Sequence, residues 1–195
     1  MSDQRTLDVY ARKASDYSSM TNEYEAPQLA GFMADLPPGG HVLDLGCGPG
    51  KEAAAMARAG FKVTAVDAVP EMVQLASAYP GVEARCETFD DLSGEDIYDG
   101  VWANFSLLHA PREDMPRHLA AIHRALKPGG RFHIAVKTGT EAKRDRLDRL
   151  YTYFTGPELT GLLEFAGFTC TASEAGRSKG LDETYAGWIA ISAHA

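Results

Sequence analysis

Short apolar runs alternate with amphipathic stretches along most of the chain. The runs predict strands at 41–45, 61–67, 82–86, 98–108, where the strand passes into a loop, and 131–138. The amphipathic stretches predict helices at 50–60, 70–81 and 112–126. Strands that alternate with helices of this length indicate right-handed βαβ units, and therefore an open, doubly wound parallel sheet.

The two ends of the chain depart from this alternation. Residues 3–18 read as a helical or irregular lead, and the helix expected at 26–36 is stopped by two prolines and two glycines. After a helix at 156–168, the runs 168–174 and 184–195 form two strands with no helix between them. Such strands usually pair as an antiparallel hairpin, and the last one is apolar enough to lie inside the sheet.

The expected fold class is therefore α/β. It is a Rossmann-like, doubly wound, mostly parallel seven-stranded sheet, with an antiparallel edge hairpin and helices on both faces. We expect one domain over 1–195, with an N-terminal helical cover at 1–36 and a Rossmann-like core at 41–195.

Composition narrows the class of partner. A formal net charge of -8 over 195 residues disfavours tracking along nucleic acid. Cys47, Cys86 and Cys170 are widely spaced, so neither a metal site nor a disulfide framework is expected. We see no apolar segment of signal-peptide or membrane-spanning type, so the expected location is cytoplasmic and away from membranes.

The stretch HVLDLGCGPGKEAAAM, residues 41–56, joins the first strand to a helix through three glycines. Glycines at 46, 48 and 50 permit a tight turn that a ligand can approach closely. A dinucleotide site would show GxGxxG, and a P-loop would show GxxxxGK followed by Ser or Thr. Here the spacing is GxGxG, and Asp44 stands before the first glycine, which favours a ligand that carries an ammonium. The alternative is a glycine turn without a ligand.

Polar residues follow the next two strands. Asp67 ends the second strand and suits the two hydroxyls of a ribose, although it also suits a helix N-terminus. Met72 lies on an adenine face or simply in the core. After the third strand, either Glu87 or Asp90 supplies an acceptor for an adenine amino group; solvated loop charges are the alternative for Asp90.

The remaining strand ends supply candidates near a reacting centre. Asn104 and Phe105 are expected to face it, and His109 to bind substrate, orient a group or take a proton. A loop histidine that only hydrogen-bonds a backbone carbonyl is the competing interpretation. Lys137 and Arg149 are candidates for an anionic substrate group, although the run KRDRLDR at 143–149 also suits a solvated face.

These motifs together resemble those of class I S-adenosylmethionine-dependent methyltransferases, over roughly residues 10–194. VLDLGCGPG resembles the family's first motif, VTAVD the second, YDGVWANFSLLH the fourth-strand motif, and LKPGGRF the approach to the fifth strand. SLLHAP also resembles compact bacterial members of small-molecule type, some loosely linked with tellurite resistance, an activity that we do not transfer.

The resemblance implies S-adenosyl-L-methionine as cofactor and assigns roles to single residues. The methionine part would be bound by Gly46, Cys47, Gly48 and Asp44, with Asp44 bound to its ammonium directly or through water. Asp67 would bind the ribose, and Glu87, Thr88 and Phe89 would surround the adenine. Asn104 and Phe105 would lie near the sulfonium. In the N-terminal cover, Tyr10 would face the substrate and Tyr17 the methionine carboxylate.

The expected activity is in-line methyl transfer to a small-molecule acceptor. No Asn-Pro-Pro-Tyr follows the fourth strand and no basic arm is present, so a nucleic-acid acceptor is not expected. A metal is not expected either, and the protein is expected to be a monomer or homodimer. Two alternatives remain open: an NAD-dependent oxidoreductase on the same fold, and a non-catalytic S-adenosylmethionine-binding protein.

Overall fold

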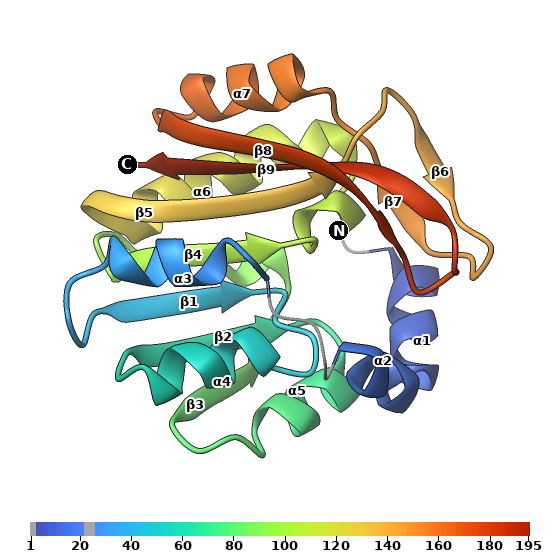
Figure 1. The fold of residues 1–195 in the computed structure, drawn as a ribbon, viewed down its shortest axis with the longest axis horizontal. Coiled ribbons are helices and arrows are strands. Elements are labelled where there is room, and N and C mark those ends of the chain that lie inside the picture. The colour runs from blue at the N-terminus through green and yellow to red at the C-terminus, as the bar shows by residue number, and fades with distance from the viewer. Residues whose placement is uncertain (1–2, 22–25) are drawn as a thin grey trace.

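A computed structural model describes residues 3–21 and 26–195, and its centre is one seven-stranded sheet (Figure 1). The strand order is β3-β2-β1-β4-β5-β9-β8. The strands are β1 His41–Leu45, β2 Lys62–Asp67, β3 Val82–Cys86, β4 Tyr98–Asn104, β5 Leu126–Lys137, β8 Thr169–Lys179 and β9 Tyr185–His194. The order reverses between β1 and β4, which is the switch point where ligands bind in open sheets of this kind.

The first five strands pair in parallel, whereas β9 runs antiparallel to both β5 and β8. The antiparallel hairpin that was predicted from the last two apolar runs is therefore confirmed, and so is the inner position of the final strand. Physically, β9 is suited to that position because Ala190, Ile191 and Ala193 are all buried. The edge strand β8 is largely exposed.

Two layers of helices cover the sheet. The helices α3 Leu29–Ala34, α4 Lys51–Arg58 and α5 Pro70–Ala76 pack on one face, and α6 Met115–Ala125 and α7 Gly156–Phe165 on the other. Successive strand residues point to opposite layers: Val101 belongs to the α6 and α7 side, and Trp102 to the α3 and α4 side. The predicted Rossmann-like α/β fold with helices on both faces is confirmed.

Helix boundaries follow local signals in the sequence. Pro70 occupies the first position of α5, where its missing N–H costs nothing. Thr155 and Glu158 form a capping box at the start of α7. The helix expected at 26–36 is shorter and spans only Leu29–Ala34. The strand expected from residue 131 begins earlier, at Leu126, because Leu126 already pairs with β4 and residues 127–130 then bulge out of register before the pairing resumes at Arg131.

Two helices and a small hairpin gather at the carboxyl ends of the parallel strands (Figure 1). The helices are α1 Gln4–Arg12 and α2 Ala14–Thr21, and the hairpin pairs β6 Ala142–Arg144 with β7 Leu150–Thr152. Residues 1–2 and 22–25 of the expected N-terminal cover lie outside the described part of the chain. Sequence analysis did not predict β6 and β7, whose three residues each carry no clear period.

None of the helices in the described ranges is long and apolar enough to cross a membrane.

Candidate functional site

A pocket opens at the switch point of the sheet, beneath α1 and α2. Every residue predicted to bind the cofactor lines it, namely Tyr17, Asp44, Gly46, Cys47, Gly48, Asp67, Met72, Glu87, Thr88, Phe89, Asn104 and Phe105. Tyr10 and His109 line it as well. Sequence analysis missed several other lining residues, among them Asp3, Thr6, Leu7, Glu52, Trp102 and Ser106.

The glycine loop after β1 depends on backbone angles that favour glycine. Gly46 has φ of 78°, and a Cβ there would lie 2.3 Å from Cβ of Ser106. Gly50 has φ of 83° at the start of α4, and a Cβ there would lie 2.6 Å from Cβ of Ala76. Both positions therefore need glycine on steric grounds, which allows α4 to follow β1 without a longer connection.

The N–H groups of this loop are already bound within the protein. Those of Gly46 and Cys47 donate to the carbonyl oxygen of Val66, at 2.8 and 2.9 Å. That of Gly48 donates to Oδ2 of Asp67, at 2.9 Å. A pyrophosphate needs loop N–H groups that point at it, so these amides do not offer the dinucleotide type of anion site.

Asp44 lies near the end of β1, with only 3% of its surface exposed. Its Oδ2 has no hydrogen-bond partner in the protein, and the residue lines the pocket. Burial, helped by the nearby carboxylates of Glu52 and Asp67, raises the pKa of Asp44 well above its ordinary value. A buried carboxylate oxygen without a partner is costly, so it is suited to a cationic group of a ligand.

Asp67 ends β2 on the opposite side of the loop. Its Oδ2 accepts from the N–H of Gly48, and its Oδ1 from the N–H of Val69 at 2.9 Å. Burial raises the pKa of Asp67, and these two hydrogen bonds oppose the rise. Because a carboxylate has about four acceptor positions, both oxygens can still accept from the hydroxyls of a ribose.

Residues after β3 form one wall of the pocket. Thr88 caps a short 3-10 helix, Phe89–Asp91, and Asp91 completes the capping box. Asp90 instead pairs with Arg117, with 2.6 Å between the charged atoms, and does not line the pocket. Glu87 does line it, so of the two candidate acids only Glu87 is placed at the pocket. Met72 is 1% exposed and packs with Ala14 and Val69 beside the same wall.

The end of β4 brings two further residues to the pocket. The side chain of Asn104 hydrogen-bonds the carboxylate of Glu52 in the first turn of α4. Phe105 has φ of 55°, a left-handed conformation that costs a bulky residue about 1–3 kcal/mol. Its N–H donates to the carbonyl of Ala135 at 3.0 Å, which helps to hold that conformation. Strain of this kind in a pocket residue is typical of a functional site.

His109 uses both ring nitrogens within the protein. Its Nδ1 lies 2.7 Å from the carbonyl oxygen of Leu150, and its Nε2 lies 2.9 Å from the hydroxyl of Tyr10. A carbonyl only accepts, so Nδ1 carries the proton, and Nε2 accepts from Tyr10 in the neutral ring. Burial lowers the pKa of His109 to about 4, and the charges of Arg149 and Lys137 act in the same direction.

The two cations predicted for substrate binding do not line the pocket. Arg149 is 1% exposed and makes a double contact with Asp145 through Nε and Nη2, at 2.9 and 2.6 Å. The alternative of a solvated face for residues 143–149 is therefore wrong for Arg149. Nη1 of Arg149 donates to the hydroxyl of Tyr10 at 2.9 Å. Lys137 lies outside the lining as well, with Nζ 3.9 Å from the ring centre of Tyr151.

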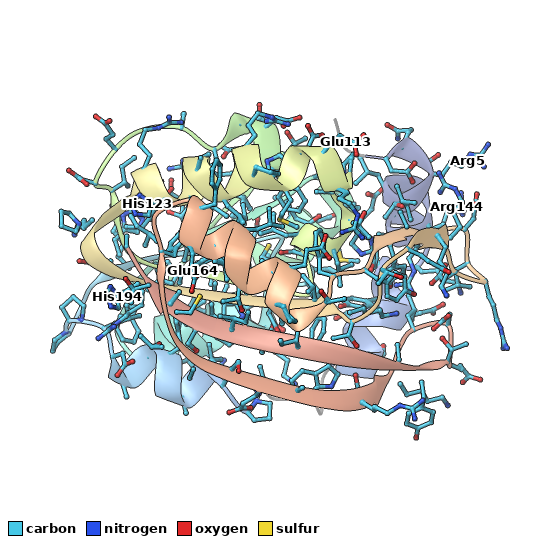
Figure 2. The ribbon with its side chains drawn as sticks, turned by 90° about the horizontal axis from the view of Figure 1, so that it is seen from above. Arg5, Glu113, His123, Arg144, Glu164 and His194 are labelled. Atoms are coloured by element: carbon cyan, nitrogen blue, oxygen red, sulfur yellow. The ribbon has the colours of Figure 1, made fainter. Side chains whose placement is uncertain are left out.

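Contacts between α1 and the β6–β7 hairpin close the pocket. Figure 2 shows Arg144 of the hairpin beside α1, on the same side as Arg5. Arg144 donates to both carboxylate oxygens of Asp3, at 2.7 and 3.0 Å. The N–H of Leu150 donates to the hydroxyl of Thr6 at 2.8 Å. The cover therefore rests on pairings more than 130 residues apart in sequence.

Comparison with known proteins agrees with this geometry. Residues 42–130 match the model of the methyltransferase domain family. The crystal structure of Burkholderia thailandensis 1,6-didemethyltoxoflavin-N1-methyltransferase, with bound 1,6-didemethyltoxoflavin and S-adenosylhomocysteine, superposes with a TM-score of 0.81 at 29% identity, over 98% of this chain and 87% of that one. The domain match and these similarities together support a class I S-adenosylmethionine-dependent methyltransferase, a family whose cofactor is S-adenosylmethionine.

Two further relatives show how widely the fold is used. A ubiquinone biosynthesis O-methyltransferase of Xanthomonas oryzae is 37% identical over 112 residues, which cover 53% of this chain. This chain spans 46% of the length of that enzyme. The cyclase SpnF has the same fold, with a TM-score of 0.77 at 17% identity, over 99% of this chain and 96% of that one.

Proposed function

We propose that this protein transfers the methyl group of S-adenosylmethionine to a small-molecule acceptor. The observation that carries the proposal is Asp44, a pocket-lining residue whose buried Oδ2 has no hydrogen-bond partner in the protein, together with the acidic strand end at Asp67 in the same lining. A nucleoside that carries an amino acid supplies an ammonium for the first carboxylate and ribose hydroxyls for the second.

The residues of the pocket fit the parts of this cofactor. Asp44, Gly46, Cys47 and Gly48 would hold the methionine part, with Tyr17 near its carboxylate. Asp67 would bind the ribose. Glu87, Thr88, Phe89 and Met72 would surround the adenine, and Asn104 and Phe105 would lie near the reacting methyl group.

Bound S-adenosylmethionine would supply an electrophilic methyl group and a neutral thioether leaving group. The protein's task is then to align the acceptor and exclude water. His109 is a weak base here, because its pKa is about 4 and its Nε2 is bound by Tyr10. We therefore propose that His109 holds Tyr10 against the acceptor, and that the acceptor atom reacts through a lone pair of its own.

The acceptor is proposed to be a compact molecule held by aromatic side chains. Tyr10 and Phe105 line the pocket, and no lysine or arginine does so among the described residues. The relatives include an O-methyltransferase and an N1-methyltransferase, so the family accommodates both oxygen and nitrogen acceptors. The pocket is lined by five acidic residues and, among the described residues, by no lysine or arginine, which favours a neutral or cationic acceptor over an anionic one. Lys137 and Arg149 would not contact the acceptor directly, because aromatic side chains such as Tyr10 and Tyr151 lie against them.

An NAD-dependent oxidoreductase is the less favoured hypothesis. The N–H groups of the glycine loop already donate to acceptors within the protein, and the carboxylates that line the pocket would repel a pyrophosphate. A non-catalytic binding protein would keep the cofactor site and lack turnover.

The experiment has two stages. Titration calorimetry should show binding of S-adenosylmethionine and S-adenosylhomocysteine, and none of NAD. Asp67→Ala should weaken S-adenosylmethionine at least tenfold, whereas the exposed Asp35→Ala should not change its affinity. Incubation with pooled metabolites should then produce S-adenosylhomocysteine. Binding of NAD alone would overturn the proposal, and cofactor binding without turnover on any pool would favour the non-catalytic alternative.

A further inference from the structure

The pocket holds more negative charge than the assigned roles use. Its lining includes the carboxylates of Asp3, Asp44, Glu52, Asp67 and Glu87, and within the described ranges no lysine or arginine. Asp3 is neutralised by its double contact with Arg144. The proposed cofactor roles account for the acids at the ends of the first three strands. One carboxylate in the pocket, that of Glu52, therefore has no role.

Glu52 is placed by α4 rather than by a strand end. It stands in the first turn of that helix, two residues after Gly50, the glycine that begins it. The side chain of Asn104 hydrogen-bonds its carboxylate, and its own backbone N–H does so too. These contacts turn the carboxylate toward the pocket, on the side where β1 and β4 end.

Glu52 and Asp44 act on each other. Burial raises the pKa of Glu52, and Glu52 is the charged neighbour that raises the pKa of Asp44 most. Lys51 acts on Glu52 from the next position but does not line the pocket. Two neighbouring carboxylates, one buried and one partly buried, disfavour each other's charged form, and a cationic ligand group relieves this.

We propose that Glu52 and Asp44 together bind the ammonium of the amino-acid part of the cofactor. The inference rests on the proposed function and adds a residue of α4 to the residues that bind S-adenosylmethionine. Asn104 is then a positioning residue, since its hydrogen bond orients Glu52. A carboxylate from the helix and one from the strand would approach the same ammonium, which has three protons to donate.

Affinities for three ligands distinguish binding of the ammonium by Glu52 from other roles of this residue. S-adenosylmethionine and S-adenosylhomocysteine both carry the ammonium, whereas 5′-methylthioadenosine has the same nucleoside without the amino-acid part. Calorimetry of Glu52→Gln should show S-adenosylmethionine and S-adenosylhomocysteine weakened by about tenfold or more, the range for a charge-assisted hydrogen bond. Affinity for 5′-methylthioadenosine should stay within about twofold of the unmodified protein, which also reports that the pocket is folded.

Glu71→Gln is the matched control, because Glu71 is an exposed first-turn glutamate of α5 that does not line the pocket. It should leave all three affinities unchanged. Equal losses for all three ligands in Glu52→Gln would mean a structural role and overturn the inference. A loss for S-adenosylmethionine alone would place Glu52 at the sulfonium, and no loss would remove it from the site. If the unmodified protein binds none of the three, the proposed function itself fails.

Discussion

The hydroxyl of Tyr10 lies 2.9 Å from Nε2 of His109, and this contact joins the N-terminal cover to the loop after β4. The Nδ1–H···O=C bond to Leu150 makes Nε2 the acceptor, so the hydroxyl proton of Tyr10 points to His109. The oxygen of Tyr10 is then free to accept from Nη1 of Arg149. The directions of these hydrogen bonds are mutually consistent, with His109 neutral and Arg149 charged.

Tyr10→Phe removes the middle of this chain of hydrogen bonds. Nε2 of His109 then loses its donor, and Nη1 of Arg149 loses its acceptor, in a buried region. The free energy of unfolding should fall by roughly 1–3 kcal/mol, the usual cost of an unsatisfied buried polar group. Urea denaturation at pH 7 measures this. Tyr185→Phe, at a side chain that is 67% exposed, should change stability by less than about 0.5 kcal/mol, and an equally small effect at Tyr10 would contradict the network.

His109 should make the folded protein less stable as the solution is acidified. Its pKa is about 4 in the folded protein and about 6.5 in the unfolded chain, so the unfolded state binds more protons between these values. Stability is therefore lost as pH falls from about 6.5 toward 4. His109→Gln should reduce the loss between pH 7 and pH 5 by about 2 kcal/mol. The difference between variant and parent isolates this residue, because His41, His118 and His133 titrate in both. Equal losses in the two proteins would mean that His109 is protonated when folded.

Asp44→Asn should separate stability from binding. The raised pKa of Asp44 means that the folded protein holds a proton there which the unfolded chain releases near pH 4. Stability of the ligand-free protein therefore falls as pH rises through that raised pKa. At pH 8 the asparagine variant should be more stable than its parent by roughly 1 kcal/mol or more, because it buries no charge. Its affinity for S-adenosylmethionine should drop at least tenfold. Thermal unfolding with and without ligand tests both effects, and a variant that is destabilised when ligand-free would refute the assignment of a costly buried carboxylate.

Arg144→Gln should loosen the cover. The double contact with Asp3 is only partly buried, with side-chain exposures of 31% and 18%, so it is worth about 1 kcal/mol. Amide hydrogen exchange across α1 should therefore speed up about fivefold, while exchange in β1 and β4 stays unchanged. The neighbouring Lys143→Gln provides the control, because Lys143 contacts the exposed Glu141 and the ring of Tyr153 rather than α1. Unchanged exchange in α1 would mean that Thr6 and Tyr10 alone hold the cover.

Much of the fold could be predicted because its signals are local. Alternating apolar runs and amphipathic stretches define βαβ units, and the handedness of their crossovers leaves few sheet topologies. Parallel strands end at one edge of a sheet, so acids such as Asp44 and Asp67 could be placed in one site before any coordinates were known. The short strands β6 and β7 could not be predicted, because three residues are too few to show a period.

The sequence by itself determined the class of fold and the glycine turn, and its resemblance to a known family implied the cofactor. Tertiary structure alone decided what the charged side chains do. Arg149 is buried where Asp145 and Tyr10 contact it. Burial keeps His109 neutral, and a helix 99 residues away brings the hydroxyl of Tyr10 to its Nε2. Glu52 belongs to the site because α4 turns it toward the end of β4. Periodicity reports which face of an element is apolar, whereas the ionisation and pairing of a side chain depend on distant partners that only folding brings within a few ångströms.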